Sequence, residues 1–390
     1  MTKIDAPWVE APASQAVMDA LGGQAYFVGG CVRNALLDAP VADIDIATPL
    51  EPDDVVAHLV AADIKAVPTG IAHGTVTAVH LGEPIEVTTF RADVETDGRR
   101  AVVAFTTDIA VDAGRRDFTM NALYADHAGN LVDPLGGLSD LRARKVRFIG
   151  NAHDRIREDY LRILRFFRFH AWYGADGIDA EGLAACAELA DGIETLAHER
   201  IGWEIRKLLS APDPAPAVAS MAASGVLMRC LPGADPSALA PLVHLEEEAG
   251  VACHWHRRLT VLGGGPWGEA LRLSNAEIKA LDAIRDAIQS TESLEVQAYR
   301  HGSEAALSAT LILAASTGQG VPRNLMEVIA LGASARFPVV ARDLLARGVE
   351  QGPGLGAMLK QLEEGWIESG FKLEKEELLA DVDVGGSLRQ

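Results

Sequence analysis

Two aspartates with a single residue between them are the first feature of this 390-residue chain that could do chemistry. Asp43 and Asp45 lie in the stretch DIDIAT, where acidic and apolar residues alternate as in a strand with one buried face. Side chains two apart on a strand face the same way, so the two carboxylates would lie side by side and repel unless a cation separates them. Mg²⁺, bound by hard oxygen ligands and substrate phosphates, is the usual cation at such a site. A surface strand with solvated acids is the alternative interpretation.

Two glycines and an arginine precede this acidic pair. Gly29 and Gly30 stand between an apolar strand pattern, QAYFV, and a short helical stretch, and Arg33 lies one turn into that stretch. Glycines at such a junction let backbone N–H groups approach a phosphate, and an arginine one turn later could neutralise a triphosphate. Glu86, in the later strand pattern PIEVTTF, is the best candidate for a third acidic group on a neighbouring strand.

The elements that must hold these residues are short strands and helices in the first part of the chain. Strands are predicted at 24–30, 43–47, 74–81 and 84–90, with a tight turn at 82–84, and helices at 12–22, 31–37, 52–62 and 118–124. Residues 91–114 carry polar and glycine breaks and are expected to contain a mobile loop. Arg99 and Arg100 lie in that loop.

After residue 150 the strand patterns stop. Helices are predicted at 153–173, 179–190 and 198–210, and the rest is rich in Ala and Leu at helical spacing. We therefore expect an α+β protein with three parts. Residues 1–150 would form a head with a mixed β-sheet, residues 151–210 a helical neck, and residues 211–390 a helical body or tail.

The net charge of −20 argues against generic nucleic-acid binding, but the charge is unevenly distributed. Residues 90–170 hold 14 of the 35 Lys and Arg, which could form a basic strip facing a polyanion or could pair with neighbouring acids. No apolar run is long enough to predict a membrane span, and the N-terminus lacks a secretion pattern. The four cysteines are far apart, which is typical of a reducing, cytoplasmic location.

Four motifs together resemble one known family. GGCVRN with DIDIAT, RRDFTMNAL at 115–123, REDYLRILRFFRF at 157–169 and HERIGWEIRKLL at 198–209 are similar to the motifs of the class II tRNA nucleotidyltransferases (CCA-adding enzymes) and bacterial poly(A) polymerases. This family lies within the polymerase-β-like nucleotidyltransferases. The resemblance covers residues 25–210, and the tail matches no motif. One position differs, because Asn34 stands where the family usually has Asp after the arginine.

The resemblance implies nucleotidyl transfer, in which an RNA 3′-hydroxyl attacks the α-phosphate of an NTP and pyrophosphate leaves. Asp43 and Asp45 are expected to hold Mg²⁺, and the glycines and Arg33 to face the triphosphate. The leading expectation is C, C and A addition to the tRNA 3′ end from CTP and ATP. A poly(A) polymerase, a partial CC- or A-adding enzyme, and a non-catalytic RNA-binding relative remain alternatives. No membrane or protein partner is expected, and no RNA-binding residues are assigned.

The second motif supplies three further candidates by resemblance. Arg116, Asp117 and Asn121 match positions near the nucleotide, and the Asn121 amide could bond a ribose hydroxyl. Asp117 and Asn121 are four apart and would share a face if the segment is helical. Helix capping by Asp117 is an alternative that excludes none of this.

The third motif supplies the expected nucleobase reader. Asp159 can only accept hydrogen bonds and Arg162 can only donate them, and residues three apart in the predicted helix 153–173 are neighbours. Cytosine and adenine each offer an amino donor beside a ring-nitrogen acceptor, so by resemblance this pair would accept C and A and reject U and G. Without the resemblance an ordinary salt bridge is the simpler interpretation. Arg165 extends the same face, and Glu158 is expected to be structural.

Overall fold

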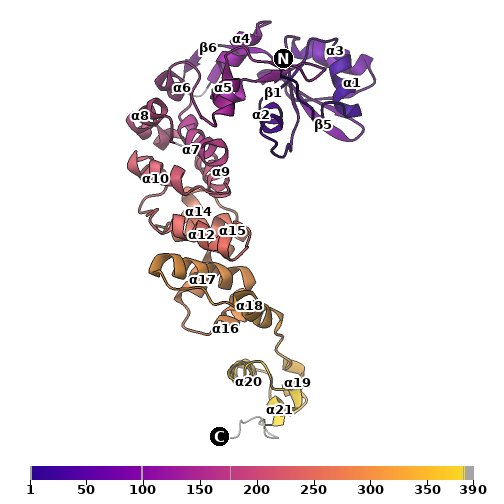
Figure 1. The fold of residues 1–390 in the computed structure, drawn as a ribbon. Coiled ribbons are helices and arrows are strands. Elements are labelled where there is room, and N and C mark those ends of the chain that lie inside the picture. The colour runs from indigo at the N-terminus through magenta and orange to yellow at the C-terminus, as the bar shows by residue number, and fades with distance from the viewer. Residues whose placement is uncertain (1, 98–99, 176, 381, 383–390) are drawn as a thin grey trace. The chain divides into compact units, whose positions relative to one another are not determined.

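The computed structural model, drawn in Figure 1, describes residues 2–97, 100–175, 177–380 and 382. The chain forms two compact units. The first unit comprises residues 1–243, 253–255 and 262–273, and the second comprises 244–252, 256–261 and 274–390. All the named strands lie in the first unit, which also contains every residue singled out above. The proposed boundaries at residues 150 and 210 stay a prediction.

The sheet of the first unit is mixed, as expected. The strands are β1 (Tyr26–Val28), β2 (Asp45–Thr48), β3 (Lys65–Gly70), β4 (Thr75–His80), β5 (Glu83–Thr89), β6 (Arg91–Asp97), β7 (Arg100–Phe105), β8 (Tyr124–Ala125) and β9 (Leu131–Val132). Seven of them form one sheet in the order β3-β4-β5-β2-β1-β8-β9, in which β2 and β5 run parallel and the other pairs antiparallel. The α+β prediction is therefore confirmed.

The helices of the first unit follow the predicted order with shorter bounds. They are α1 (Pro12–Ala20), α2 (Gly30–Leu36), α3 (Pro52–Ala61), α4 (Ile109–Gly114), α5 (Gly137–Arg142), α6 (Ala152–Glu158), α7 (Leu161–Tyr173), α8 (Ala180–Glu188), α9 (His198–Leu209), α10 (Ala215–Ala223), α11 (Val226–Cys230) and α14 (Trp267–Ala270). Three 3₁₀ turns are η1 (Ile71–His73), η2 (Thr119–Asn121) and η3 (Ala190–Thr195). The predicted helix at 118–124 is only the turn η2, which leads straight into β8.

The second unit is built from helices. Two helices, α12 (Leu239–Glu248) and α13 (Trp255–Val261), have residues in both units. The helices that follow are α15 (Asn275–Gln289), α16 (Leu294–His301), α17 (Ser303–Thr317), α18 (Leu325–Ser334), α19 (Ala341–Leu345), α20 (Pro353–Glu368) and α21 (Lys375–Ala380). Arg257, Arg258 and Glu246 form a buried ion network in this unit. Among the described residues no helix combines the length and the apolar character needed to cross a membrane.

The turn between β4 and β5 sets the register that places Glu86. His80 pairs with Glu83 across a two-residue turn, in which Leu81 and Gly82 both have positive φ, 52° and 84°. This is the geometry of a hairpin turn that matches strand twist, and it lies one residue before the predicted turn. β5 then runs beside β2 with Glu86 opposite Asp45.

Residues 91–97 and 100–105 form the paired strands β6 and β7, which the sequence did not predict. They are followed by α4, whose start is capped because Asp108 accepts a hydrogen bond from the Ala110 N–H at 2.8 Å. The polar composition hid two strands that satisfy each other's backbone groups. Arg99, expected in a loop here, lies outside the described residues, as does the side chain of Arg100.

The predicted helix at 153–173 is two helices, because the backbone becomes extended at Asp159 (φ −156°, ψ 107°). The Leu161 N–H donates to the Asp159 carboxylate at 3.1 Å, so this side chain satisfies a backbone donor at the start of α7. The break changes the relation between Asp159 and Arg162, because they no longer share one continuous helix.

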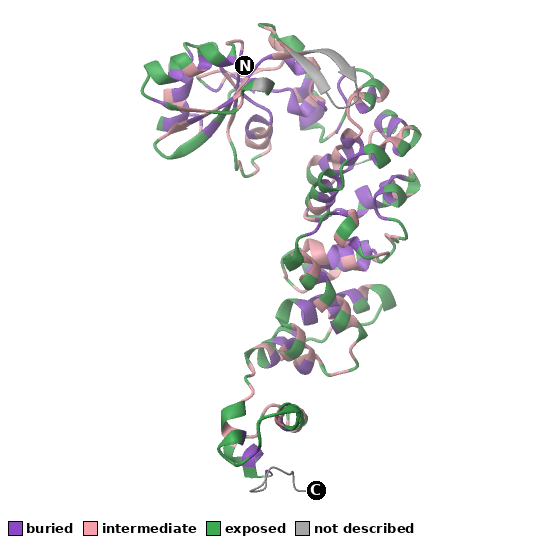
Figure 2. Cartoon of the chain, turned by 180° about the vertical axis from the view of Figure 1, so that it is seen from behind, coloured by how far each residue is buried: buried purple, intermediate pink, exposed green. Residues whose placement is uncertain are grey.

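An aromatic cluster connects the second motif to α7. The Phe118 ring lies 5.0 Å from Phe148 and 5.1 Å from Phe169, and Phe166 packs against both Phe118 and Phe148. All four are buried, and Figure 2 shows buried residues in the strands and on the packed sides of the helices. Such packing leaves little freedom, so Asp117, next to Phe118, has a fixed position relative to α7.

Candidate active site

A pocket of about 560 Å³ gathers almost all the predicted site residues. Its lining includes Gly29, Gly30, Arg33, Asp45, Glu86, Arg116, Asp117, Asn121, Asp159, Arg162 and Arg165. These come from the sheet, from η2 and its flanks, and from the helices after residue 150, all within the first unit. Asp43 is the predicted residue that does not line the pocket.

The acidic edge of the pocket is formed by Asp45 and Glu86. They are direct partners in the parallel pair β2–β5, and neither makes an ion pair within the described residues. Burial, and then the Glu86 charge, raise the pKa of Asp45 from its ordinary value to about 6; the Arg116 charge opposes this rise, and the Asp43 charge adds to it. The site therefore carries negative charge that Arg116 offsets only in part.

Asp43 lies differently from the prediction. β2 begins at Asp45, so Asp43 precedes the strand and is exposed. The backbone pairing extends one step beyond β2, since the Glu86 N–H donates to the Ile44 carbonyl at 3.4 Å. The argument that a strand aligns the two aspartates thus holds for Asp45 and Glu86 rather than for Asp43. The Asp43 charge still acts on Asp45.

The residues available for a divalent cation are hard oxygen donors. Among the residues that the structure describes, no three His, Cys, Asp or Glu side chains converge closely enough to form a complete metal centre. Mg²⁺ usually binds through one or two carboxylates together with substrate phosphates rather than in an all-protein cage. The partly compensated acidic edge, with the raised pKa of Asp45, supplies such carboxylates.

Gly29 and Gly30 form the junction between β1 and α2, which we call the glycine elbow and which lies beside Arg116. Gly29 has φ 71°, which favours glycine, and its N–H donates to the Leu123 carbonyl at 3.2 Å. A Cβ there would lie 3.4 Å from Arg116 Nη1. Arg116 is itself oriented by Asp112 Oδ2 at 3.2 Å and by the Tyr124 hydroxyl at 3.1 Å. The elbow therefore provides space beside a guanidinium of fixed direction.

Arg33 is buried, and its guanidinium donates hydrogen bonds to three neighbouring side chains. It donates to Asn121 Oδ1 at 2.5 Å and to the Tyr173 hydroxyl at 2.8 Å, and its guanidinium lies 4.1 Å from the Tyr173 ring centroid. It also donates twice to Asn34 Oδ1, while the Asn34 amide donates to the Pro40 carbonyl at 2.7 Å. Asn34 is thus a structural residue of α2 that supports Arg33.

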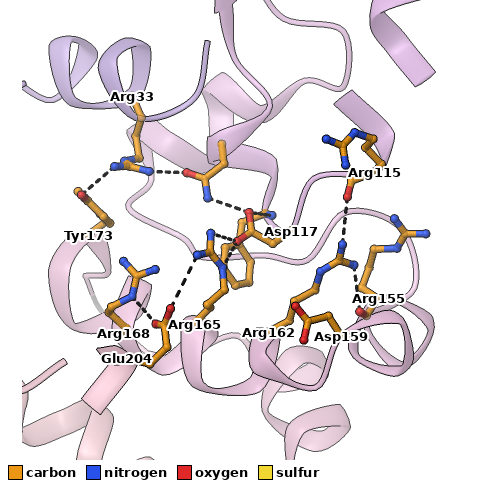
Figure 3. A network of polar contacts seen from close by, with 12 residues as sticks. Arg33, Arg115, Asp117, Arg155, Asp159, Arg162, Arg165, Arg168, Tyr173 and Glu204 are labelled. Carbon is orange, nitrogen blue, oxygen red and sulfur yellow. Dashed lines mark hydrogen bonds and ion pairs between the residues drawn. The ribbon is translucent and has the colours of Figure 1, made fainter. Parts of the chain in front are cut away.

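Figure 3 shows a chain of polar contacts that runs from Arg33 across the pocket. Asn121 Nδ2 donates to Asp117 Oδ1 at 2.9 Å, and Arg165 Nε donates to Asp117 Oδ2 at 2.7 Å. Burial alone would raise the pKa of Asp117, but Arg165 and Asn121 hold it below its ordinary value. Asp117 also accepts from the Phe118 N–H at 2.9 Å. The 3₁₀ turn η2, rather than an α-helix, brings Asp117 and Asn121 together.

Asp159 and Arg162 both line the pocket but do not pair with each other (Figure 3). Arg162 pairs with Glu158 at 2.5 Å and donates to the carbonyl of Arg115 at 3.1 Å. Asp159 pairs with Arg200 at 2.7 Å. The predicted structural role of Glu158 agrees with this geometry, whereas a simple i,i+3 pair is not formed.

Several pocket residues escaped the sequence analysis. Arg91, Arg115 and Arg200 also line the pocket. Arg115 sits next to Arg116 in the motif, and that doubled arginine was a usable signal. Arg200 lies in the fourth motif but was not among the predicted site residues. It pairs with Asp159 and also lines the pocket, because α9 packs against α7.

Comparison with known proteins agrees with this geometry. Residues 25–147 match the family described as Poly A polymerase head domain, and residues 177–237 match the probable RNA and SrmB-binding site of polymerase A. The chain is 33% identical over 379 residues to CCA tRNA nucleotidyltransferase 1, mitochondrial, of Mus musculus, covering 90% of this chain and 85% of that protein. It is 32% identical over 394 residues to the CCA-adding enzyme of Levilactobacillus brevis, covering 95% and 96%.

Solved structures give the same result. The fold matches the Bacillus stearothermophilus CCA-adding enzyme in complex with CTP, with a TM-score of 0.75, 28% identity, and coverage of 96% of this chain and 97% of the other. It also matches the fold of the Thermotoga maritima CCA-adding enzyme complexed with tRNA_CCA, with a TM-score of 0.70 at 19% identity and 97% coverage of both chains. The chain belongs to the CCA-adding enzyme family of tRNA nucleotidyltransferases.

Proposed function

We propose that this chain adds C, C and A in turn to the 3′ end of tRNA, using CTP and ATP and releasing pyrophosphate. The observation that carries the proposal is the pocket itself, which combines an unpaired acidic edge, a glycine elbow and a group of arginines. Its relatives are named for CCA addition, and solved structures of relatives hold CTP or tRNA_CCA. The expected cytoplasmic location stays a prediction.

A divalent metal is generally used in this nucleotidyltransferase family. For this chain we propose Mg²⁺, held by Asp43 and Asp45, with Glu86 as the candidate third ligand. When bound, the ion would supply charge stabilisation for the attacking and leaving oxygens of the phosphoryl transfer. The acidic edge supports this role because Asp45 and Glu86 are adjacent and lack a cationic partner within the described residues.

The nucleotide would bind along the elbow and the polar chain. Gly29 and Gly30 leave room for phosphate oxygens beside Arg116, and Arg33 adds positive charge behind them. Asn121 is proposed to bond the ribose, oriented by Asp117, which receives its amide hydrogen. Arg33 and Arg165 hold the two ends of this chain, so the ribose contact would have a fixed direction.

Base selection is proposed for Asp159 and Arg162, with Arg165 beside them. Arg162 donates three hydrogen bonds, to Glu158 and to the carbonyls of Arg155 and Arg115. Since a guanidinium has five N–H donors, two of its N–H groups remain for a base. Asp159 keeps acceptor capacity beyond its contact with Arg200. The two side chains could therefore present a donor and an acceptor to C or A without a direct bond between them.

The test is an incorporation assay with purified protein on tRNA that ends before CCA, with each NTP alone and then CTP with ATP. We expect two C residues from CTP alone and a complete CCA only with both nucleotides. Long A tracts from ATP alone would favour a poly(A) polymerase. Products that stop at CC in the presence of ATP, or A addition only to tRNA already ending in CC, would favour a partial enzyme. No product would favour a non-catalytic relative.

A further inference from the structure

Two exposed tryptophans and an exposed lysine lie on the helices α7 and α9, with the buried Arg168 beside them. Trp172 and Arg168 are one turn apart on α7, and Trp203 and Lys207 are one turn apart on α9. We call these four residues the tryptophan patch. Trp203 is 47% exposed and Trp172 40%, which is unusual for the largest apolar side chain on well-packed helices. Nothing in the candidate active site accounts for them.

The contacts within the patch hold it together. Lys207 Nζ lies 3.6 Å from the Trp203 ring centroid, and the Arg168 guanidinium lies 5.8 Å from it. The Trp172 indole N–H donates to the Lys207 backbone carbonyl at 2.7 Å. An exposed ring held between cations is the arrangement that single-stranded nucleic acids meet on their binding proteins, where bases stack and phosphates are neutralised.

Buried ion pairs connect the tryptophan patch to the active-site pocket. Glu204, buried on α9, joins Arg168 (2.5 Å) on the patch to Arg165 (3.8 Å) on the pocket wall. On the other side, Lys207 lies close enough to feel the Asp43 charge, which opposes the lowering of the Lys207 pKa by burial. An RNA strand whose end reaches the acidic edge would therefore have its preceding nucleotides near Trp203 and Lys207.

We propose that the tryptophan patch binds the single-stranded 3′ end of the RNA substrate, with an unpaired base stacked on Trp203 and a backbone phosphate on Lys207. This assignment rests on the proposed function, since it places the strand that receives the new nucleotide. It assigns the RNA end to particular side chains, of which Trp203 and Lys207 lie within the segment 177–237 that matches a probable RNA-binding family.

The energetics favour a base over the resting contact with Lys207. An exposed cation–π contact contributes a factor of roughly two to five in an equilibrium constant. Stacking of a base on an aromatic side chain contributes roughly five- to a hundredfold. A base can therefore displace the ammonium from the ring, and the released ammonium gains a phosphate partner close by. The net charge of −20 would repel RNA elsewhere, which makes a local basic site more important.

The experiment measures binding of a short RNA hairpin with an unpaired 3′ end, and of the same hairpin with a blunt end, to the full chain by fluorescence anisotropy. We expect Trp203→Ala to weaken binding of the unpaired end about tenfold and Trp203→Phe to restore most of it, since phenylalanine keeps a stacking face. Binding of the blunt hairpin should stay within twofold of the wild-type value. Leu81→Ala, which removes a 73% exposed apolar side chain from the β4–β5 turn, is the matched control.

Lys207 is tested through salt. Lys207→Ala should reduce the slope of log affinity against log salt by about 0.7, because one phosphate contact to a single strand is lost. Lys65→Ala, which removes an exposed lysine from β3, should leave that slope unchanged. Trp203→Ala should lower affinity without changing the slope.

Three results would overturn the proposal. The first is that Trp203→Ala binds the unpaired end as tightly as the wild type. The second is that Trp203→Ala and Trp203→Phe lose the same affinity for it. The third is that Trp203→Ala loses as much affinity for the blunt hairpin as for the unpaired end. The binding assay contains no NTP, so it reads the patch even if the wild-type chain transfers no nucleotide. If the wild-type chain adds CCA and Trp203→Ala binds the RNA as tightly as the wild type, the proposal for the tryptophan patch is wrong and the proposed function stands.

Discussion

The pocket has two kinds of carboxylate, and the contrast between them separates chemistry from scaffold. Asp45 and Glu86 on the sheet face each other without a cationic partner among the described residues, and the pKa of Asp45 is raised to about 6 by burial and then by Glu86. Asp112 and Asp117 are more buried, yet their pKa values are lowered. Burial opposes that lowering, but arginines outweigh it, Arg165 in the case of Asp117.

The difference indicates what each set is for. A buried acid whose charge is already compensated is held in place and orients other groups, as Asp112 does for Arg116. An acid held next to another acid costs folding free energy that a cation would recover. An acid whose pKa is raised by burial and by a neighbouring acid therefore indicates a ligand-binding site, and an acid whose charge is paired indicates the scaffold around that site.

The largest effect should come from the acidic edge. Asp45→Asn should lower turnover in CCA addition about a thousandfold or more, because coordination of the catalytic ion supplies several kcal/mol of transition-state stabilisation. The variant should fold at least as stably as the wild type, since it removes a repelling charge. Steady-state kinetics with CTP and a thermal melt without metal measure the two quantities. A variant that keeps one tenth of the activity would remove the basis for the comparison.

Asp117→Asn should lose folding stability, which Asp45→Asn should keep. The change removes the closest carboxylate partner of the Arg165 guanidinium, which keeps only the longer contact with Glu204 at 3.8 Å, and removing one member of such a buried pair should cost about 2 kcal/mol of unfolding free energy. Chemical denaturation gives this value. Equal stability of Asp117→Asn and Asp45→Asn would show that the two classes of carboxylate do not differ.

A third prediction concerns base selection by Asp159. Asp159→Ala should narrow the preference for CTP over UTP by about tenfold, because one good base-edge hydrogen bond is worth roughly that much discrimination. Competition assays with labelled CTP and UTP measure it. Asp154→Ala, which removes an exposed acid of α6 paired with Arg157, is the control and should leave selection unchanged. An unaltered preference in Asp159→Ala would exclude it as a reader.

The smallest effect is in the pH dependence of stability without metal. Asp112 and Asp117 have lowered pKa values, so the stability they contribute is complete above the ordinary aspartate pKa and is lost as pH falls through the folded values. Asp45 has the opposite sign, since the cost of its ionised form grows as pH rises from the ordinary aspartate pKa to about 6 and is complete above that pH.

The comparison that isolates Asp45 is a pair of denaturation series at pH 7 and pH 4.5. The stability gained by Asp45→Asn over the wild type should be larger at pH 7 than at pH 4.5. A gain that does not change with pH would mean that the Asp45 charge is compensated in the folded chain.

Most of the pocket could be found from the sequence because each motif keeps its chemistry within a few residues. Gly29, Gly30 and Arg33 lie on one strand–helix junction, and local spacing alone brings Asp117 to Asn121. Where a partner comes from a distant segment, the sequence pattern had no means to show it.

The break at Asp159 is such a case. Apolar spacing continues through residues 153–173 and predicts one helix. The structure interrupts it where Asp159 satisfies the Leu161 N–H and pairs with Arg200, which lies 41 residues later. The position of Asp43 is a different case, because the alternation in DIDIAT predicted a strand that begins two residues before β2 does. At Asp159 a contact with a distant residue accompanies the departure from the local pattern.

The central claim is that Asp43, Asp45 and the triphosphate would together hold a divalent cation. The most direct measurement is anomalous diffraction from crystals of the chain grown with CTP and Mn²⁺ in place of Mg²⁺. We expect a Mn²⁺ peak within coordination distance of the Asp43 and Asp45 carboxylates and of CTP phosphate oxygens. Bound CTP with Mn²⁺ contacting neither aspartate would contradict the account.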